Sequence, residues 1–123
     1  MSERPGAATN ELDVESQSVA WFALVDAGKG EASWSAAGAL FREALDPARW
    51  DEQLRAAREP LGPLTSRVLA VKETLAAIPG VPDAKYVVRQ YHSVYDRIRA
   101  VTETLTLQLE GDGVWRVVGY FIR

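Results

Sequence analysis

Hydrophobic and polar residues alternate along residues 101–109, in the last third of the chain. This period of two is typical of a strand that buries one face. The next run, residues 114–122, is rich in β-branched and aromatic residues, which favours a second strand. Between the two runs lies Gly111-Asp112-Gly113, a sequence typical of a hairpin loop. The pattern therefore predicts a β-hairpin at the end of the chain.

The length of the loop sets the register of this hairpin, because a shift of one residue turns every side chain to the opposite face of the sheet. A two-residue loop would pair apolar with polar positions throughout. A three-residue loop makes the apolar faces coincide, and we therefore expect three facing pairs: Leu109 with Trp115, Leu107 with Val117, and Glu103 with Phe121.

Two further strands are predicted upstream of the hairpin. Residues 64–77 form a weakly alternating run, which ends in a turn rich in proline and glycine at 78–83. Residues 85–95 follow, and a short turn at 96–98 leads into the hairpin. Four such runs joined by short turns predict a four-stranded antiparallel meander.

The first half of the chain has helical periodicity instead. Apolar residues recur at helical spacing over residues 12–27, and Gly28 ends this segment. A second helix is predicted over 31–45. Asp46-Pro47, an N-cap residue followed by proline, then opens a third helix that runs to about Arg58.

Three helices followed by four strands make an α+β domain. Each predicted helix carries one tryptophan, and the apolar face of the sheet is the surface available to cover it. Strands of about ten residues are longer than usual and are expected to bend. We therefore expect three helices packed on a curved sheet that forms a cone, in a single domain over residues 12–123 behind a flexible lead-in at 1–11.

The composition excludes several kinds of site. The 123 residues include no cysteine, which excludes disulfides and thiolate metal ligands, and only one histidine, which argues against a multi-histidine metal centre. We expect neither a metal nor a cofactor. The net charge of −3 is far from the basic footprint of a nucleic-acid-binding protein. No apolar run is long enough to span a membrane.

The start of the chain is the only guide to its compartment. The sequence as given begins without the apolar stretch of a signal peptide, which is expected of a cytoplasmic protein. A leader removed from the N-terminus would instead make the protein secreted or periplasmic.

Taken together, several motifs resemble an uncharacterised family of small bacterial proteins in the nuclear-transport-factor-two-like superfamily. The matching residues cover nearly everything after residue 12: Trp21-Phe22-Ala23-Leu24-Val25-Asp26-Ala27-Gly28, Ser33-Trp34, Trp50, Arg58-Glu59-Pro60-Leu61-Gly62, Ser66-Arg67, Pro79-Gly80-Val81-Pro82-Asp83 with Tyr86, Glu103-Thr104 and Trp115-Arg116-Val117-Val118-Gly119-Tyr120. The resemblance implies a curled sheet with a cone-shaped pocket. It implies no reaction, because the superfamily hosts many chemistries, among them ketosteroid isomerase, scytalone dehydratase and polyketide cyclases. The catalytic motif of ketosteroid isomerase matches no stretch of this chain.

Glu103 is the most informative polar residue, because it lies on the apolar face of its predicted strand, in line with Leu105. A carboxylate there is costly unless it is paired or hydrogen-bonded. One interpretation is a structural ion pair with an arginine, Arg67 being the first choice ahead of Arg58 and Arg89. The other is a pocket carboxylate with a raised pKa that acts as a general base or holds a ligand.

His92 is the other candidate for acid–base chemistry, because histidine titrates near neutral pH. A two-residue turn at Arg97-Ile98 would set His92 opposite Glu103 as a catalytic dyad, and a three-residue turn would set Tyr91 there instead. The family resemblance favours an inward aromatic side chain at 91. We therefore expect His92 on an exposed face of the sheet.

Five residues are candidates for ligand binding: Trp21, Trp34, Arg67, Tyr91 and Glu103. The tryptophans are most simply core anchors, although an aromatic box for an apolar ligand would have the same sequence. Arg58 and Arg67 flank a Pro-Leu-Gly-Pro corner and together could hold an anion. Asp26, near a helix end, is expected to pack or to hydrogen-bond to the backbone. The expected ligand is small and either apolar or anionic.

These observations favour a small non-catalytic binding or accessory domain. The alternatives are a small-molecule enzyme of the isomerase, cyclase or dehydratase kind, with Glu103 as general base with or without His92, and a protein-binding module such as an inhibitor or immunity-type protein. We also expect a homodimer that packs through the sheet. The basis is an apolar strip predicted on its outer face, Val118, Tyr120 and Ile122 beside Thr102, Thr104 and Thr106.

Overall fold

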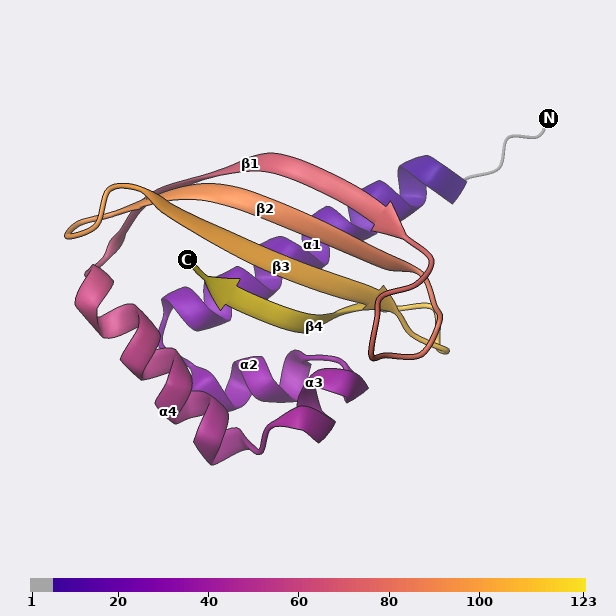
Figure 1. The fold of residues 1–123 in the computed structure, drawn as a ribbon, viewed down its shortest axis with the longest axis horizontal. Helices are drawn as coiled ribbons and strands as arrows, with labels where there is room; N and C mark the ends of the chain where they lie inside the picture. Colours follow the sequence, from indigo (N-terminus) through magenta and orange to yellow (C-terminus); the bar gives the residue numbers. More distant parts are fainter. Residues whose placement is uncertain (1–5) are drawn as a thin grey trace.

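A computed structural model describes the backbone from Gly6 to Arg123 and the side chains from Glu11 onward. Helices occupy the first half of the described chain and a four-stranded sheet occupies the second (Figure 1). The α+β class predicted from the sequence is confirmed. Residues 1–5 of the predicted flexible lead-in lie outside the described residues, whereas the chain is already helical from Gly6.

The first helix ends close to where it was predicted but begins six residues earlier than the predicted Leu12, and the last helix has both predicted ends. α1 (Gly6–Asp26) is followed by Gly28, whose φ of +73° is a conformation that glycine adopts without strain. α4 (Pro47–Arg58) begins after Asp46, whose carboxylate accepts a hydrogen bond of 2.8 Å from a backbone N–H of the first turn. A short 3-10 helix, η1 (Glu59–Leu61), then leads to the sheet.

The second predicted helix, 31–45, is wrong in one respect, because it is two short helices, α2 (Gly30–Ala36) and α3 (Ala39–Ala44). The backbone between them is extended at Gly38, whose N–H donates to the carbonyl of Val117 in the last strand at 2.7 Å. A Cβ on Gly38 would lie 2.7 Å from the carboxylate of Glu110. The helix is interrupted because the chain packs closely on the sheet here.

The sheet is an antiparallel meander in chain order, as predicted, of β1 (Leu64–Leu75), β2 (Tyr86–Tyr95), β3 (Val101–Leu109) and β4 (Trp115–Ile122). All helices lie on one side of it in Figure 1: α1 runs along the sheet, α3 contacts β4, and α2 packs against α4. The sheet is not strongly curled, so the expected cone does not form. Aromatic side chains of α1 pack directly on the face that a cone would have enclosed.

The hairpin loop sets the predicted register close to the turn. Two predicted pairs, Leu109 with Trp115 and Leu107 with Val117, are confirmed. Beyond these pairs the register shifts by one residue, because Val118 is an extra residue of β4 that forms a β-bulge.

This bulge reverses which side chains at the end of β4 face the helices. Glu103 faces Ile122 and not the predicted Phe121, and Tyr120 lies opposite Leu105 on the helix-facing side. Phe121 points outward and is half exposed. The predicted outer strip is therefore wrong for Tyr120 and Ile122, because the alternation of a sequence does not reveal an inserted residue.

We expect Trp115→Ala to lower the free energy of unfolding by about 3–5 kcal/mol, because it removes a large buried ring and leaves a cavity. Trp115 is only 2% exposed and belongs to the main core cluster. Urea denaturation measures the change. As a control, Phe121→Ala on the outer face should cost about 1 kcal/mol or less. An unchanged midpoint for Trp115→Ala would contradict this prediction.

Candidate functional site

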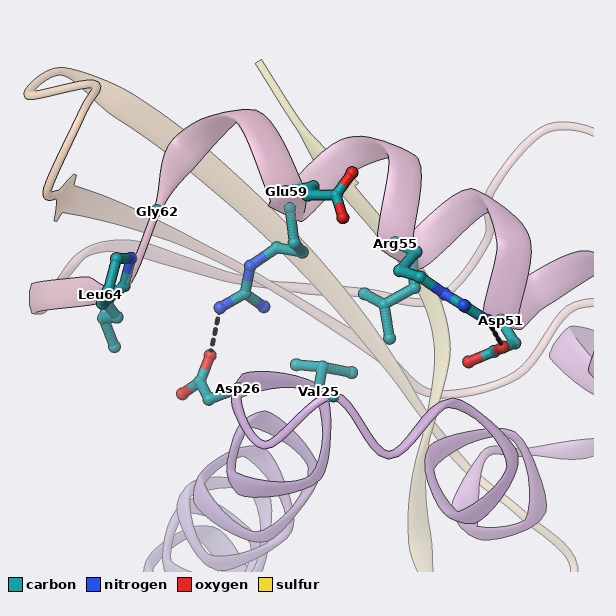
Figure 2. Close-up of a pocket in the computed structure, with 11 residues that line it drawn as sticks. Val25, Asp26, Asp51, Arg55, Glu59, Gly62 and Leu64 are labelled. Carbon is teal, nitrogen blue, oxygen red and sulfur yellow. Dashed lines mark hydrogen bonds and ion pairs between the residues drawn. The ribbon is translucent and has the colours of Figure 1, made fainter.

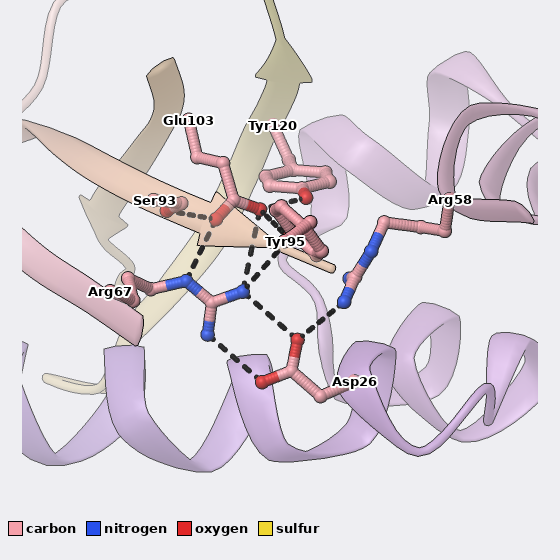
Figure 3. A network of polar contacts seen from close by, with 7 residues as sticks. All are labelled: Asp26, Arg58, Arg67, Ser93, Tyr95, Glu103 and Tyr120. Atoms are coloured by element: carbon pink, nitrogen blue, oxygen red, sulfur yellow. Dashed lines mark hydrogen bonds and ion pairs between the residues drawn. The ribbon is translucent and has the colours of Figure 1, made fainter. Parts of the chain in front are cut away.

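Glu103 is completely buried on the inner face of β3, and both of its carboxylate oxygens are occupied (Figure 3). Oε1 accepts hydrogen bonds from Nε of Arg67 at 2.8 Å and from the hydroxyl of Ser93 at 2.6 Å. Oε2 accepts from the hydroxyl of Tyr95 at 2.9 Å and from that of Tyr120. Since a carboxylate has about four lone-pair positions, Glu103 has no position left for a substrate. The predicted ion pair with Arg67 is confirmed.

The pKa values of the ionisable groups around Glu103 are shifted away from neutral pH. Burial alone would raise the pKa of Glu103, but hydrogen bonds from Arg67, Ser93 and Tyr120 outweigh burial and hold the pKa below its usual value. Burial and the nearby negative charge raise the pKa of Tyr95 to about 12 and also raise that of Tyr120. The carboxylate is therefore ionised and both hydroxyls are protonated at pH 7.

Asp26, the last residue of α1, connects Glu103 to the helices. Its Oδ1 accepts from Nη2 of Arg58 at 2.8 Å and from Nη2 of Arg67 at 2.9 Å, and its Oδ2 accepts from Nη1 of Arg67 at 2.9 Å. Burial alone would raise the pKa of Asp26, yet these two arginines hold it below its usual value. The anion that the two arginines were predicted to hold is thus a carboxylate of the chain itself.

We call this connected set of side chains the Glu103 network: Asp26, Arg58, Arg67, Ser93, Tyr95, Glu103 and Tyr120. Its members come from α1, α4 and all four strands (Figure 3). Two carboxylates and two guanidinium groups balance one another, so the network is electrically neutral at pH 7. It joins the helical layer to the sheet through polar contacts in an otherwise apolar interior.

Tyr91 and His92 lie on opposite faces of β2. Tyr91 pairs with Glu103 in the ladder, as a three-residue turn predicts, and its hydroxyl accepts from Nε of Arg89 at 2.8 Å. His92 is exposed and pairs with Thr102 on the outer face, as expected. The acid–base dyad of His92 with Glu103 does not form.

The two tryptophan candidates for ligand binding contact protein groups. The indole N–H of Trp21 donates to the carbonyl of Ser33 at 2.9 Å, and its ring lies 5.9 Å from that of Trp50. The indole N–H of Trp34 donates to the carbonyl of Leu45 at 2.6 Å. These contacts support the interpretation of both residues as core anchors.

A second buried arginine attaches α1 to the sheet. Arg89 is fully buried, and its guanidinium pairs with Glu15 and, at 3.5 Å, with Glu11. Lys72 of β1 also donates to Glu11 at 2.9 Å. Arg89 is therefore not a partner of Glu103, as one alternative had it, but holds the first half of α1 against β1 and β2.

Two hollows flank Asp26. One is a groove of about 400 Å³ between α1 and β1, where Arg67 and Tyr91 lie together beside Phe22 and Leu69. The polar groups of these two candidates are already paired, because Arg67 binds Asp26 and Glu103 and Tyr91 binds Arg89. Trp21, Trp34 and Glu103 do not line this groove.

The other hollow is a pocket of about 270 Å³ between the end of α1 and α4, which we call the α4 pocket (Figure 2). Its lining includes Val25, Asp26, Leu54, Arg58 and Leu64. None of the five predicted ligand residues lines it. Arg58 is the one lining residue that sequence analysis had singled out as an anion-binding group.

Sequence reasoning missed three members of the network. Tyr95 shares a strand face with Tyr91, and Ser93 lies between them on that face, so their inward direction could have been read from the spacing. The inward direction of Tyr120 could not have been read from the spacing, because the bulge at Val118 turns this side chain inward.

The fold and the network together define a small α+β domain with a buried polar centre. Within the described residues there is no group of three or more histidine, aspartate or glutamate side chains suited to a metal ion. No described helix is long and apolar enough to cross a membrane.

Residues 17–120 match the family described as "Protein of unknown function (DUF4019)", and the chain belongs to this family. This match confirms that the chain belongs to an uncharacterised family, as the sequence motifs suggested. The chain matches no curated protein.

We expect Tyr120→Phe to lower the free energy of unfolding by about 2 kcal/mol, because the hydroxyl donates to a charged, buried acceptor. Tyr86→Phe is the matched control, since the hydroxyl of Tyr86 donates to a neutral carbonyl, that of Pro82, at 2.6 Å. That loss should be about 1 kcal/mol. Urea melts of both variants measure the difference, and equal losses would contradict the special role of the Glu103 contact.

Proposed function

We propose that this chain is a small non-catalytic binding domain of the nuclear-transport-factor-two-like superfamily. The superfamily placement is supported by the order of the elements, helices followed by a four-stranded antiparallel meander, and by the motifs that suggested the family. The observation that carries the functional proposal is the complete pairing of Glu103 by four side-chain donors.

The enzyme alternative requires Glu103 to act as a general base, and the geometry argues against this role. A general base needs a lone pair that can reach the proton of a substrate and a pKa near the working pH. Glu103 is fully buried, its oxygens are occupied, and its pKa is lowered. His92, the other candidate, lies on the opposite face of the sheet. The charge balance of the network instead suits a structural centre that holds a binding surface in place.

The ligand site proposed for this domain is the α4 pocket, which borders the network without including Glu103. Its walls combine apolar side chains, such as Val25 and Leu54, with the guanidinium of Arg58. A concave, partly apolar site with a few polar groups is the usual form of a small-molecule site. This arrangement supports a small ligand with an apolar body.

Glu103→Gln tests the structural role. The change leaves Arg67 without one of its two counter-charges in a buried site, so we expect a loss of about 3 kcal/mol in the free energy of unfolding at neutral pH. Urea melts measure it, with Glu73→Gln on the exposed face of β1 as the control that should change little. A Glu103→Gln variant more stable than the wild type would overturn the structural interpretation and favour a functional carboxylate.

The same variant should change the response to acid. The pKa values of Glu103 and Asp26 are lowered by folding, so their stabilisation is present above the usual pKa values of 4.5 and 3.8 and is lost as the pH falls through the lower, folded-state values. We expect the wild type to lose stability below about pH 4.5 more steeply than Glu103→Gln. Urea midpoints measured between pH 7 and pH 3 give the comparison, and parallel curves would contradict it.

A homodimer that packs through the sheet remains a prediction. Its support is now a different set of outward apolar side chains, since Val68 and Val71 of β1 and Phe121 of β4 are about half exposed or more. Sedimentation at high micromolar concentration should give a dimer that Val68→Lys weakens. Val19→Lys, at an equally exposed position on α1, should leave it intact. A wild-type monomer under these conditions would refute the dimer.

A further inference from the structure

Arg58 has hydrogen-bonding capacity that no residue described by the structure uses. Its Nη2 donates to Asp26 at 2.8 Å, and its guanidinium carbon lies 5.0 Å from the centre of the Tyr95 ring. Its Nε and Nη1 are buried, and neither has an acceptor among the described residues. A buried donor without a partner is costly and therefore uncommon. Arg67, by contrast, uses all three of its nitrogens.

Arg58 lies at the end of the network nearest α4, at the border of the α4 pocket. The side chain of Arg58 is 14% exposed and belongs to the pocket lining. The same lining includes the apolar side chains of Val25, Leu54 and Leu64. Figure 3 shows that Arg58 joins the network through its bond to Asp26, with no bond drawn between Arg58 and Glu103. A molecule in the pocket can therefore approach Arg58 without disturbing the contacts of Glu103.

The charges around the pocket favour an uncharged ligand. Three carboxylates line it, Asp26, Asp51 and Glu59, against two arginines, Arg55 and Arg58. Asp26 already neutralises Arg58, and Asp51 pairs with Arg55. A ligand carboxylate would therefore add a negative charge next to Asp26 and meet repulsion. A carbonyl oxygen accepts the same hydrogen bonds without adding charge.

We propose that the α4 pocket binds a small uncharged molecule that has an apolar body and a carbonyl oxygen, with Arg58 donating to that oxygen. The proposal rests on the function proposed above and specifies its ligand class. A cavity of about 150 Å³ is enough for benzene. The α4 pocket, at about 270 Å³, accommodates a ring with a short substituent. Val25 and Leu54 contact the apolar body.

Three probes of similar size and shape test the proposal: acetophenone, which is neutral and has a carbonyl; benzoate, which is an anion; and ethylbenzene, which has no acceptor. Each is titrated into the wild type while the side-chain Nε–H resonance of Arg58 is followed by NMR. We expect acetophenone to shift this resonance and to bind about tenfold more tightly than ethylbenzene, the ratio typical of one hydrogen bond to a charged group. Benzoate should bind more weakly than acetophenone.

Arg58→Met removes the donors and should abolish the tenfold preference for acetophenone over ethylbenzene, while Asp26 keeps its bonds to Arg67. Arg55→Met is the matched control, because Arg55 lines the same pocket but has an exposed side chain that pairs with Asp51. It should preserve the preference. If Arg58→Met does not fold, the wild type alone is used. A shift of the Arg58 Nε–H resonance on addition of acetophenone then supports the proposal, and an unchanged resonance contradicts it.

Each contrary outcome overturns a stated part of the proposal. Equal affinity for acetophenone and ethylbenzene, or a preference that survives Arg58→Met, removes Arg58 as the recognition group. If benzoate binds more tightly than acetophenone, the pocket selects an anion and not a neutral molecule. Binding of none of the three probes rejects the pocket. None of these results alters the outcome of Glu103→Gln, so a failure here is distinguishable from a failure of the non-catalytic role.

Discussion

The buried carboxylate of Glu103 constrains the arrangement of nearly every element in this fold. An ionised side chain in the interior is tolerated only when its hydrogen bonds are complete. The donors come from β1, β2 and β4, and Arg67 extends the contact to Asp26 at the end of α1. A slip of one residue in any of the three strand pairs would withdraw a donor from the carboxylate. The hydrogen bonds of the network therefore help to specify the register of the strands, which the pattern of apolar residues already favours.

Much of this arrangement follows from the sequence, because it depends on periodicity and on local turn chemistry. The alternation of residues 101–109, the Gly-Asp-Gly loop and the proline at the start of α4 each predicted their elements correctly. The pairing of Arg67 with Glu103 was predictable since a carboxylate on an apolar strand face requires a cation nearby. These inferences depend only on residues that are close together in the sequence, or on the general energetic cost of burying a charge.

The features that sequence analysis missed depend on contacts between distant segments. The interruption at Gly38 arises where the helical segment meets β4, and the bulge at Val118 inserts one residue into an otherwise regular strand. The bulge has the larger consequence, because it carries Tyr120 from the outer face to Glu103. The apolar pattern of β4 fits either arrangement, so only the completed network distinguishes them. Because Tyr120 faces inward, the interior is filled. The aromatic rings of α1 and the side chain of Tyr120 occupy the face that a curled sheet would have left open.

The two arginines that bind Asp26 differ in their capacity for a further contact. Arg67 lies between two carboxylates, and every one of its nitrogens has a partner. Arg58 shares the same aspartate but lies at the edge of the network, and two of its nitrogens have no acceptor in the described part of the chain. Acid–base chemistry needs a group that can exchange a proton near neutral pH, and neither arginine nor the carboxylates they hold can do so. A fixed guanidinium with free donors can instead recognise an oxygen, and its charge is already balanced by Asp26. The recognition proposed at Arg58 would therefore leave the protonation of Glu103, and with it the centre of the fold, unchanged.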